Sequence, residues 1–375
     1  ESAIVFTAQW FRLGGSVAHY LTRRYESEVI MDIFHKEFIG MLYKKIEDNP
    51  NKISEMDVEK LIAKIIPEFV RILEESLNTL SKEMLQERQQ GFSDFMIDNV
   101  SRWKAGFDLL ESHIVACTEA GEKINSFYRA EAVEKNDLLL DLLVRHHARA
   151  CHISNEILCL LKSGFPDAAH ARWRALHEVN VTAMFLDKHG YECAERFYFH
   201  DVIDSYDVMT EHKKYEDRLQ AKAPTTEIIE DCRQEYDRLI KHYGKSFTFH
   251  YGWAAHVFPS RNPKTIGFAT IEKDVGLDHM RPYYKWASQN IHAGSKGMRN
   301  RLALSECDDD ILVVGQSSSG MADPAHATAL SLMQITCTLL KSKPTLDHIV
   351  LMEVIKNYTD RIGQTFLSIS KSNDS

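Results

Sequence analysis

The stretch "LLVRHHARACHISNEILCLLKSGFPDAAHARWRALHEVNVTAMFL", residues 142–186, decides the fold, because it reads as two helices joined by a tight turn. Apolar residues recur in it at spacings of three and four, which is the period of an amphipathic helix. Gly164 suits the left-handed conformation that ends a helix, and Pro166 fits the first turn of the next one. Asp167 then places a negative charge where the helix dipole favours it. The sequence therefore predicts a helical hairpin that turns at residues 162–167.

The same helical period continues through almost the whole chain, whereas the alternation typical of strands is nearly absent. The stretch "ILVVGQSSSG" at 311–320 is the one segment that we expect to form a short strand. The fold class is therefore all-α, as a multi-helix, mostly antiparallel bundle with a long-helix N-terminal extension. Helices are expected near residues 15–47, 55–90, 92–130, 134–162, 166–188, 191–220, 225–243, 278–293, 323–341 and 346–370.

A change in composition near residues 128–137 suggests a domain boundary. Residues 1–133 form an acidic helical region rich in Lys and Glu, whereas residues 134–375 are richer in His, Tyr and Trp and form the bundle domain. Long helices with charged faces bury little surface by themselves. The N-terminal region is therefore expected to act as an arm or dimerisation element, or else to pack on the bundle.

Composition narrows the function classes. The chain has 375 residues, a net charge of −9, and 44% hydrophobic and 26% charged residues, which is ordinary for a soluble globular protein. The charge argues against a surface coated by nucleic acid but leaves room for a local basic cleft. The seven cysteines are scattered and form no CxxC pair, and no secretory signal pattern is present, which together predict a cytoplasmic protein with reduced thiols. No long apolar run occurs, so no membrane-spanning helix is expected.

Most of the chemistry lies in "HARWRALHEVN", residues 170–180. At about 100° per residue, Arg172 falls in the middle of the apolar face of this helix. A second, polar face carries four residues: His170, Arg174, His177 and Glu178. An arginine keeps its charge near neutral pH and needs an anionic partner when buried. That partner is either a carboxylate of a neighbouring helix, which is a structural role, or the phosphate of a ligand in a cleft.

The segment from Arg172 to His177, an arginine and a histidine separated by four residues on a helix, resembles the R-x4-6-H signature of HEPN-type ribonucleases. The wider region, residues 134–305, also resembles a poorly characterised group of bacterial all-helical proteins. These have a Gly…Asp-Ala turn, an Arg…Glu helix and a later Tyr…Ser…His helix, which here correspond to residues 164–168, 174–178 and 284–292. Trp173 departs from the HEPN pattern, in which a polar residue mostly follows the arginine.

The resemblance implies metal-independent RNA cleavage, in which a histidine moves a proton and an arginine stabilises charge on phosphorus. The catalytic residues would be Arg172, His177 and His292, and the substrate-binding residues would be Arg174, Glu178, His170, Ser288 and Tyr284. Arg172 and His177 lie about 140° apart on a regular helix, so a distorted helix or two facing subunits would have to bring them to one phosphate. A symmetric dimer, as HEPN proteins tend to form, would meet this requirement.

The second histidine lies in "RPYYKWASQNIHAGSKGMRNR", residues 281–301. Tyr284, Ser288 and His292 follow each other at intervals of four, so we expect them to share one face of a helix that ends near Gly294. A histidine in the last turn feels the negative end of the helix dipole, which favours its protonated form. The structural alternative is that it only satisfies the last carbonyls of the helix. Lys296, Arg299 and Arg301 add a local basic patch.

Other chemistry is weaker. His147 and Cys151 have a metal-compatible spacing but lack further ligands, so no metal and no cofactor are expected. The aromatic stretch 250–258 could stack on single-stranded bases but is more typical of core. The functional prediction is an endoribonuclease that cleaves RNA and forms a homo-oligomer. The resemblance suggests that it is the effector of a bacterial toxin or phage-defence system. The alternative is a non-catalytic binding or sensor module for a nucleotide, RNA or a partner protein, which Trp173 favours.

Overall fold

The structure is a computed structural model that describes residues 58–292, 294–297, 301–306 and 312–372, together with Gly40 and Lys44. The described residues form helices and connecting turns and contain no strand, which confirms the all-α prediction. The α-helices are α4 (Val58–Arg102), α5 (Lys104–Glu134), α6 (Leu138–Lys162), α7 (Pro166–Leu219), α8 (Thr226–Tyr243), α9 (Phe268–Asp274), α10 (Arg281–Gln289), α11 (Ala322–Ser342) and α12 (Leu346–Lys371). Short 3-10 helices are η2 (Lys245–Thr248), η3 (Gly252–Val257), η4 (Pro263–Thr265), η5 (Asp278–Met280) and η6 (Leu302–Leu304).

Most predicted helices lie where the sequence pattern placed them. The ends of α6, α8, α11 and α12 agree with prediction to within four residues. The break expected near residue 91 is wrong, because α4 continues to Arg102 and the chain turns at the fully buried Trp103. The helix predicted near 15–47 lies outside the described residues except for Gly40 and Lys44, which are helical.

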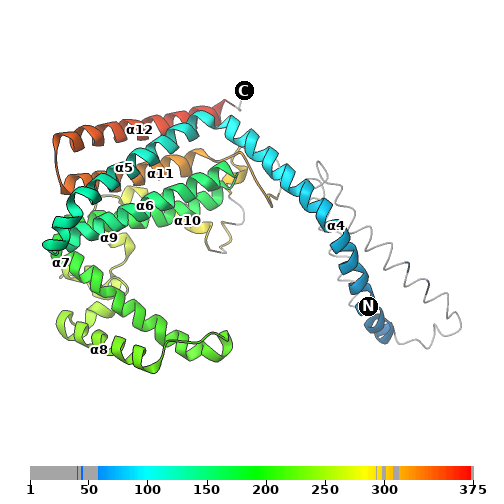
Figure 1. The fold of residues 1–375 in the computed structure, drawn as a ribbon, viewed down its shortest axis with the longest axis horizontal. Coiled ribbons are helices and arrows are strands. Elements are labelled where there is room, and N and C mark those ends of the chain that lie inside the picture. The colour runs from blue at the N-terminus through cyan, green and yellow to red at the C-terminus, as the bar shows by residue number, and fades with distance from the viewer. Residues whose placement is uncertain are drawn as a thin grey trace. The chain divides into compact units, whose positions relative to one another are not determined.

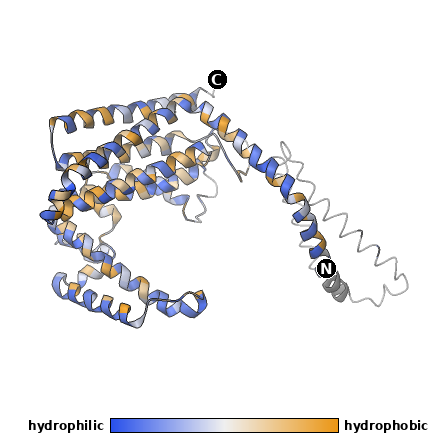
Figure 2. Ribbon diagram, viewed as in Figure 1, coloured by the Kyte–Doolittle hydropathy of each residue, from blue (hydrophilic) through white to orange (hydrophobic). Residues whose placement is uncertain are grey.

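The bundle consists of α5, α6, the first half of α7, α11 and α12, which pack against one another around one apolar core (Figure 1). Hydrophobic residues recur along α5, α6 and α11 between polar ones, as the helical period requires (Figure 2). Trp173, which lies inside the charged segment of α7, is fully buried in this core, and its indole N–H donates to the Ala327 carbonyl at 2.9 Å. The helix that carries the candidate site is therefore anchored on the bundle.

The predicted hairpin is confirmed, and its second helix is longer than expected. Gly164 has a φ of 83° after the end of α6, and the Phe165 amide donates to the Leu160 carbonyl at 2.9 Å to close the turn. Helix α7 contains a kink at Gly190, where φ is 73° and ψ is −156°. This backbone conformation is essentially restricted to glycine. The break expected at 188–191 is therefore a sharp bend between two helical halves.

A second apolar cluster lies beyond the first. It joins the second half of α7 to α8, η2, η3 and α9, with Phe185, Phe247, Trp253 and Ile271 among its members. In Figure 1, α7 runs out of the bundle toward α8. Helix α9 and the 3-10 helices were not predicted from the sequence. Helix α9 matters for the candidate site because α9, like α10, lies against the charged segment of α7.

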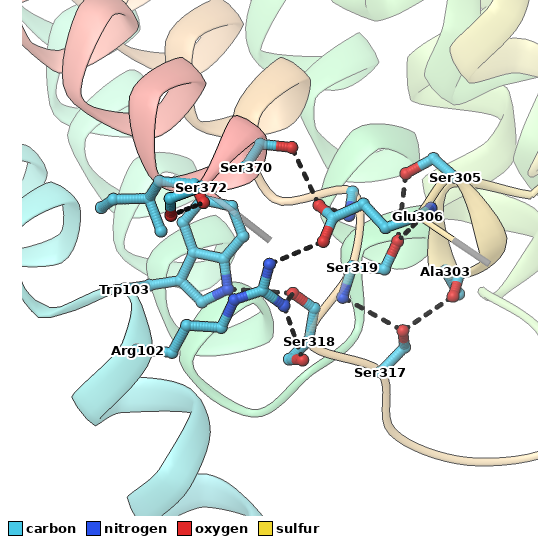
Figure 3. Close-up of polar contacts among 12 residues, drawn as sticks. Arg102, Trp103, Ala303, Ser305, Glu306, Ser317, Ser318, Ser319, Ser370 and Ser372 are labelled. Atoms are coloured by element: carbon cyan, nitrogen blue, oxygen red, sulfur yellow. Dashed lines mark hydrogen bonds and ion pairs between the residues drawn. The ribbon is translucent and has the colours of Figure 1, made fainter. Parts of the chain in front are cut away.

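The strand predicted at 311–320 is wrong for residues 312–320, which form an irregular loop, and residue 311 lies outside the described residues. Serine hydroxyls hold the last part of this loop (Figure 3). Ser319 Oγ accepts from the Glu306 amide at 3.0 Å, and the Ser318 carbonyl accepts from both Arg102 and the Trp103 indole at 2.9 Å. Side-chain hydrogen bonds to the backbone therefore take the place of a strand ladder.

The chain divides into two compact units, Glu1–Asp98 with Asp308–Gln316 and Asn99–Cys307 with Ser317–Ser375. The boundary predicted between residues 133 and 134 falls inside the second of these units, in the last turn of α5. In the part of the chain that the structure describes, no helix is long and apolar enough to cross a membrane. All candidate site residues belong to the second unit.

Candidate functional site

Arg172 faces helix α6. Its Nε forms an ion pair with Glu156 Oε2, and the two side chains are 34% and 38% exposed. His152, one turn before Glu156, lies 3.3 Å from the other carboxylate oxygen. A carboxylate of the protein therefore neutralises the charge of Arg172. The pair lies at the half-exposed surface of the α6–α7 hairpin rather than in the apolar core.

His177 faces the opposite way and is fully buried. Its Nε2 lies 2.8 Å from Oε1 of Glu272 on α9, and the other oxygen of this carboxylate forms an ion pair with Arg281 at the start of α10. The Glu272 side chain has no exposed surface. The buried His177–Glu272–Arg281 chain therefore joins α7 to α9 and α10, and it leaves His177 without contact to solvent.

His170 is also inside the protein. Its ring stacks on Trp173 with a centroid distance of 5.5 Å and meets Trp286 edge-on at 5.1 Å. Neither ring nitrogen has a hydrogen-bond partner, and burial lowers the pKa of His170 to about 4. The histidine is consequently neutral at physiological pH and packs as an aromatic residue rather than facing a ligand.

Arg174 and Glu178 form the partly exposed face of α7 together with Tyr284 of α10. Arg174 Nε donates to Glu178 Oε1 at 3.1 Å, and the Tyr284 hydroxyl donates to the same oxygen. The Arg174 guanidinium lies 4.8 Å from the centre of the Tyr284 ring, and the Arg281 guanidinium lies 5.0 Å from it. Tyr284 thus ties the outer face of α7 to the inner ion-pair chain.

Burial and the bond to Glu178 raise the pKa of Tyr284 to about 12. Burial, and then the charge of Glu178, raise the pKa of Tyr251 to about 12 as well. Both phenols therefore keep their protons at neutral pH, and Tyr284 acts as a hydrogen-bond donor to the Glu178 carboxylate. Glu178 retains a side-chain exposure of 40%, so solvent and ligands can reach it.

His292 completes this group, although not from a helix. Helix α10 ends at Gln289, so the expected placement of His292 in its last turn is wrong, and the residue lies in the following turn. Its side chain is exposed, and its Nε2 lies 3.5 Å from Nη1 of Arg174. Ser288 instead donates to the carbonyl of Tyr284 at 2.7 Å, one turn back along α10. We refer to Arg174, Glu178, Tyr284 and His292 as the Arg174 cluster.

A surface hollow of about 400 Å³ adjoins the cluster at His292. The first turn of α7 and the segment after α10 line it, with Asp167, Asn290 and Arg301 among its polar residues. The Asp167 carboxylate accepts from the amides of Leu302 and Ala303 at 2.8 and 3.2 Å, so it fixes this segment against α7. Lys296 is exposed next to the hollow in sequence, whereas Arg299 lies outside the described residues.

Among the described residues, no three His, Cys, Asp or Glu side chains are placed to hold a metal ion. His147 and Cys151 lie in the bundle core, with Cys151 Sγ 3.8 Å from the imidazole and His147 Nε2 3.0 Å from the Thr336 hydroxyl. They are therefore packing residues. The six cysteines within the described ranges form no disulfide.

The structure thus separates the residues that the sequence grouped. Arg174, Glu178, Tyr284 and His292 meet, whereas Arg172, His170 and His177 point elsewhere. Sequence reasoning missed Glu272 and Arg281 as site residues, and it took the stretch 250–258, which contains Tyr251, as more typical of core. Arg281 begins the segment that was recognised as important, but nothing marked Glu272, because it lies on the short helix α9 that sequence patterns did not reveal.

Taken together, fold and site define an all-helical protein with a partly exposed Arg–Glu–Tyr–His cluster. Residues 140–311 match the model of a family described as a family of unknown function (DUF5677). This range contains α6 except for its first two residues, the charged segment of α7, α9 and α10, and it includes every residue of the Arg174 cluster. Neither the comparison with curated proteins nor that with solved structures found a match.

Proposed function

We propose that this protein is a metal-independent endoribonuclease in which the Arg174 cluster, rather than the Arg172–His177 pair, carries the chemistry. The single observation that supports this most is the 3.5 Å approach of Arg174 Nη1 to Nε2 of the exposed His292. It brings together a guanidinium, which can bind a phosphate, and an imidazole, which can carry a proton near neutral pH.

The cluster supplies each group that the reaction needs. Glu178 takes the proton of a ribose 2′-hydroxyl while the 2′-oxygen forms a bond to phosphorus. The bond from phosphorus to the 5′-oxygen breaks, and protonated His292 gives its proton to that leaving oxygen. Arg174 stabilises the charge that develops on the phosphoryl oxygens. The products are a 2′,3′-cyclic phosphate and a 5′-hydroxyl, so no water and no metal ion enter this step.

The buried residues would support this arrangement from behind. Tyr284 donates to Glu178, and the guanidinium groups of Arg174 and Arg281 lie 4.8 and 5.0 Å from the centre of its ring. Glu272 holds Arg281 and His177. His177 therefore contributes by fixing α9 and α10 against α7, because a fully buried imidazole cannot exchange protons with a substrate.

A second candidate function is RNA or nucleotide binding without cleavage. The specific observation in its favour is that Glu178 already accepts hydrogen bonds from both Arg174 and Tyr284. Both hydrogen bonds fall on the same oxygen, Oε1, so a ribose hydroxyl would have to compete with two donors for it. In this case Arg174 and His292 would hold a phosphate and the hollow beside them would take the rest of the ligand.

A cleavage assay distinguishes these functions. The purified chain is incubated, with a chelator present, with an end-labelled RNA and with the DNA of the same sequence, which lacks the attacking hydroxyl. We expect cyclic-phosphate products from RNA alone. H292A and E178Q should each lower the rate by roughly 10²- to 10⁴-fold. R172Q is the matched control, because it removes a motif arginine outside the cluster and should leave the rate within about twofold.

Binding of the same RNA, measured by fluorescence anisotropy, completes the test. If wild type binds the RNA without cutting it, and R174Q binds it more weakly, the protein has the binding function and is not a nuclease. Equal rates for H292A, E178Q and wild type, or neither binding nor cleavage by wild type, would refute the assignment of the Arg174 cluster.

A further inference from the structure

A second hollow, larger than the first, lies on another part of the second unit. Its volume is about 520 Å³, and the end of α5, the start of α6 and the half of α7 that follows the kink at Gly190 line it. This size lies within the usual range of about 300–1,000 Å³ for small-molecule sites. None of the residues in the Arg174 cluster takes part in it.

The floor of this hollow is apolar and its wall is aromatic. Ile124 and Leu140 are buried floor residues, and Val144 continues the floor along α6. Tyr191 and Tyr198 line the wall from α7, two turns apart, and each residue is 52% exposed. Half-exposed tyrosines beside an apolar floor are typical of sites that accept a flat or branched apolar group.

The charges around the hollow are mainly negative. Asp141, Glu195 and Asp137 line it, whereas Arg129 is its lining cation among the described residues. The Asp141 carboxylate holds Arg145, whose side chain is 64% exposed, and Glu195 accepts from the Tyr243 hydroxyl at 3.2 Å. An exposed ion pair such as Asp141–Arg145 is weak, so a ligand cation can compete for the carboxylate at little cost.

We propose that this hollow is a binding site for a small organic amine with an aromatic or branched apolar body. The body would lie on Ile124, Leu140 and Val144, and the ammonium group would lie against Asp141 and Glu195. The rings of Tyr191 and Tyr198 would add cation–π attraction. The site is separate from the Arg174 cluster and does not depend on the function proposed for it.

The charge preference is tested with three probes that share one skeleton: tryptamine, tryptophol and indole-3-propionate. Their affinities for the full chain are measured by ligand-observed NMR. We expect tryptamine to bind most tightly, with a Kd of about 1 mM or below. Tryptophol should bind about three- to tenfold more weakly, and indole-3-propionate more weakly again.

Variants locate the site. D141N and E195Q should each weaken tryptamine binding about three- to tenfold and leave tryptophol binding unchanged, because only the charge is removed. D108N is the matched control, since Asp108 also forms an exposed pair on α5, with Lys104, but does not line this hollow. Y198A should weaken binding of both probes. The urea midpoint of each variant shows that it remains folded.

Three results would overturn the proposal. The first is equal affinity for all three probes, which would remove the charge argument. The second is unchanged tryptamine affinity in both D141N and E195Q. The third is no binding of any probe at low-millimolar concentration. R174Q should leave tryptamine affinity unchanged, so failure of the proposed ribonuclease function and failure of this amine site are separate outcomes.

Discussion

Glu272 offers the sharpest test of how the charged helix is held. E272Q removes the charge from a carboxylate that has no exposed surface and contacts both His177 and Arg281. The change leaves the size of the side chain almost unaltered. Any loss of stability therefore reports on the electrostatics of the buried His177–Glu272–Arg281 chain rather than on packing.

The expected magnitude follows from the surroundings. Removing one partner of a buried ion pair costs about 3–5 kcal/mol, because the remaining charge is left uncompensated. Here the Arg281 side chain is 22% exposed and can turn partly to water, and the glutamine can still accept one hydrogen bond. We therefore expect E272Q to lower the free energy of unfolding by about 2–4 kcal/mol.

E156Q is the matched control, because Glu156 contacts the other residue of the same sequence motif, Arg172, but is 38% exposed. An exposed pair of this kind is worth about 0–1 kcal/mol. Urea denaturation followed by tryptophan fluorescence measures both variants, since Trp103, Trp173, Trp253 and Trp286 all lie in the second unit. With an m-value of about 2–3 kcal/mol/M, E272Q should shift the midpoint by roughly 1 M. A loss below about 1 kcal/mol for E272Q, or equal losses for the two variants, would refute the reasoning.

Two further predictions use the same urea assay. The pKa of buried His170 is about 4, so the unfolded chain binds a proton there below its ordinary value of 6.5 and the folded chain does not. The contribution of this residue to the free energy of unfolding is thus present above pH 6.5 and is lost as the pH falls toward 4. Between pH 7 and 5 this loss amounts to about 2 kcal/mol, and H170F should abolish it. An unchanged dependence of stability on pH in H170F would contradict this. At Gly121 an added Cβ would lie 2.3 Å from Nδ1 of buried His147, so G121A should lower the free energy of unfolding by about 1–3 kcal/mol. The control G315A should lower it by less than about 0.5 kcal/mol, because no atom lies within 4 Å of a Cβ added there. Equal losses would show that His147 moves freely.

The helical period predicts most of the fold because it is a local property. The hairpin at 162–167 follows from Gly164 and Pro166 alone, and α6, α8, α11 and α12 each repeat their apolar residues over several turns. The break expected near residue 91 is wrong because the helical period continues to Arg102, and the chain turns at Trp103, whose burial in the core depends on residues far away in the sequence. Helix α9 escaped prediction because seven residues are too few to show a period.

The site was predictable only in part, because residue spacing gives a direction around a helix but not what lies there. Arg174, Glu178, Tyr284 and His292 were all singled out from the sequence, and they meet. The same pattern gave no means of telling that Arg172 would find Glu156 one helix away, 16 residues earlier in the chain. Nor could it show that Glu272, 95 residues beyond His177, would form a hydrogen bond with that histidine.

These partners change what the R-x4-H spacing means in this chain. A motif of one arginine and one histidine on a straight helix can act at a single phosphate only if another element redirects one of the two. Here α6 neutralises Arg172 on one side and α9 buries His177 on the other, so two facing copies of the chain would present neither group in an unpaired state. The arginine that approaches a histidine is instead Arg174, which lies two residues along the same helix from Arg172 and on a different face, and its partner is His292 in the turn after α10. A nuclease built in this way needs His292 and tolerates R172Q, which is the reverse of what the motif alone would require.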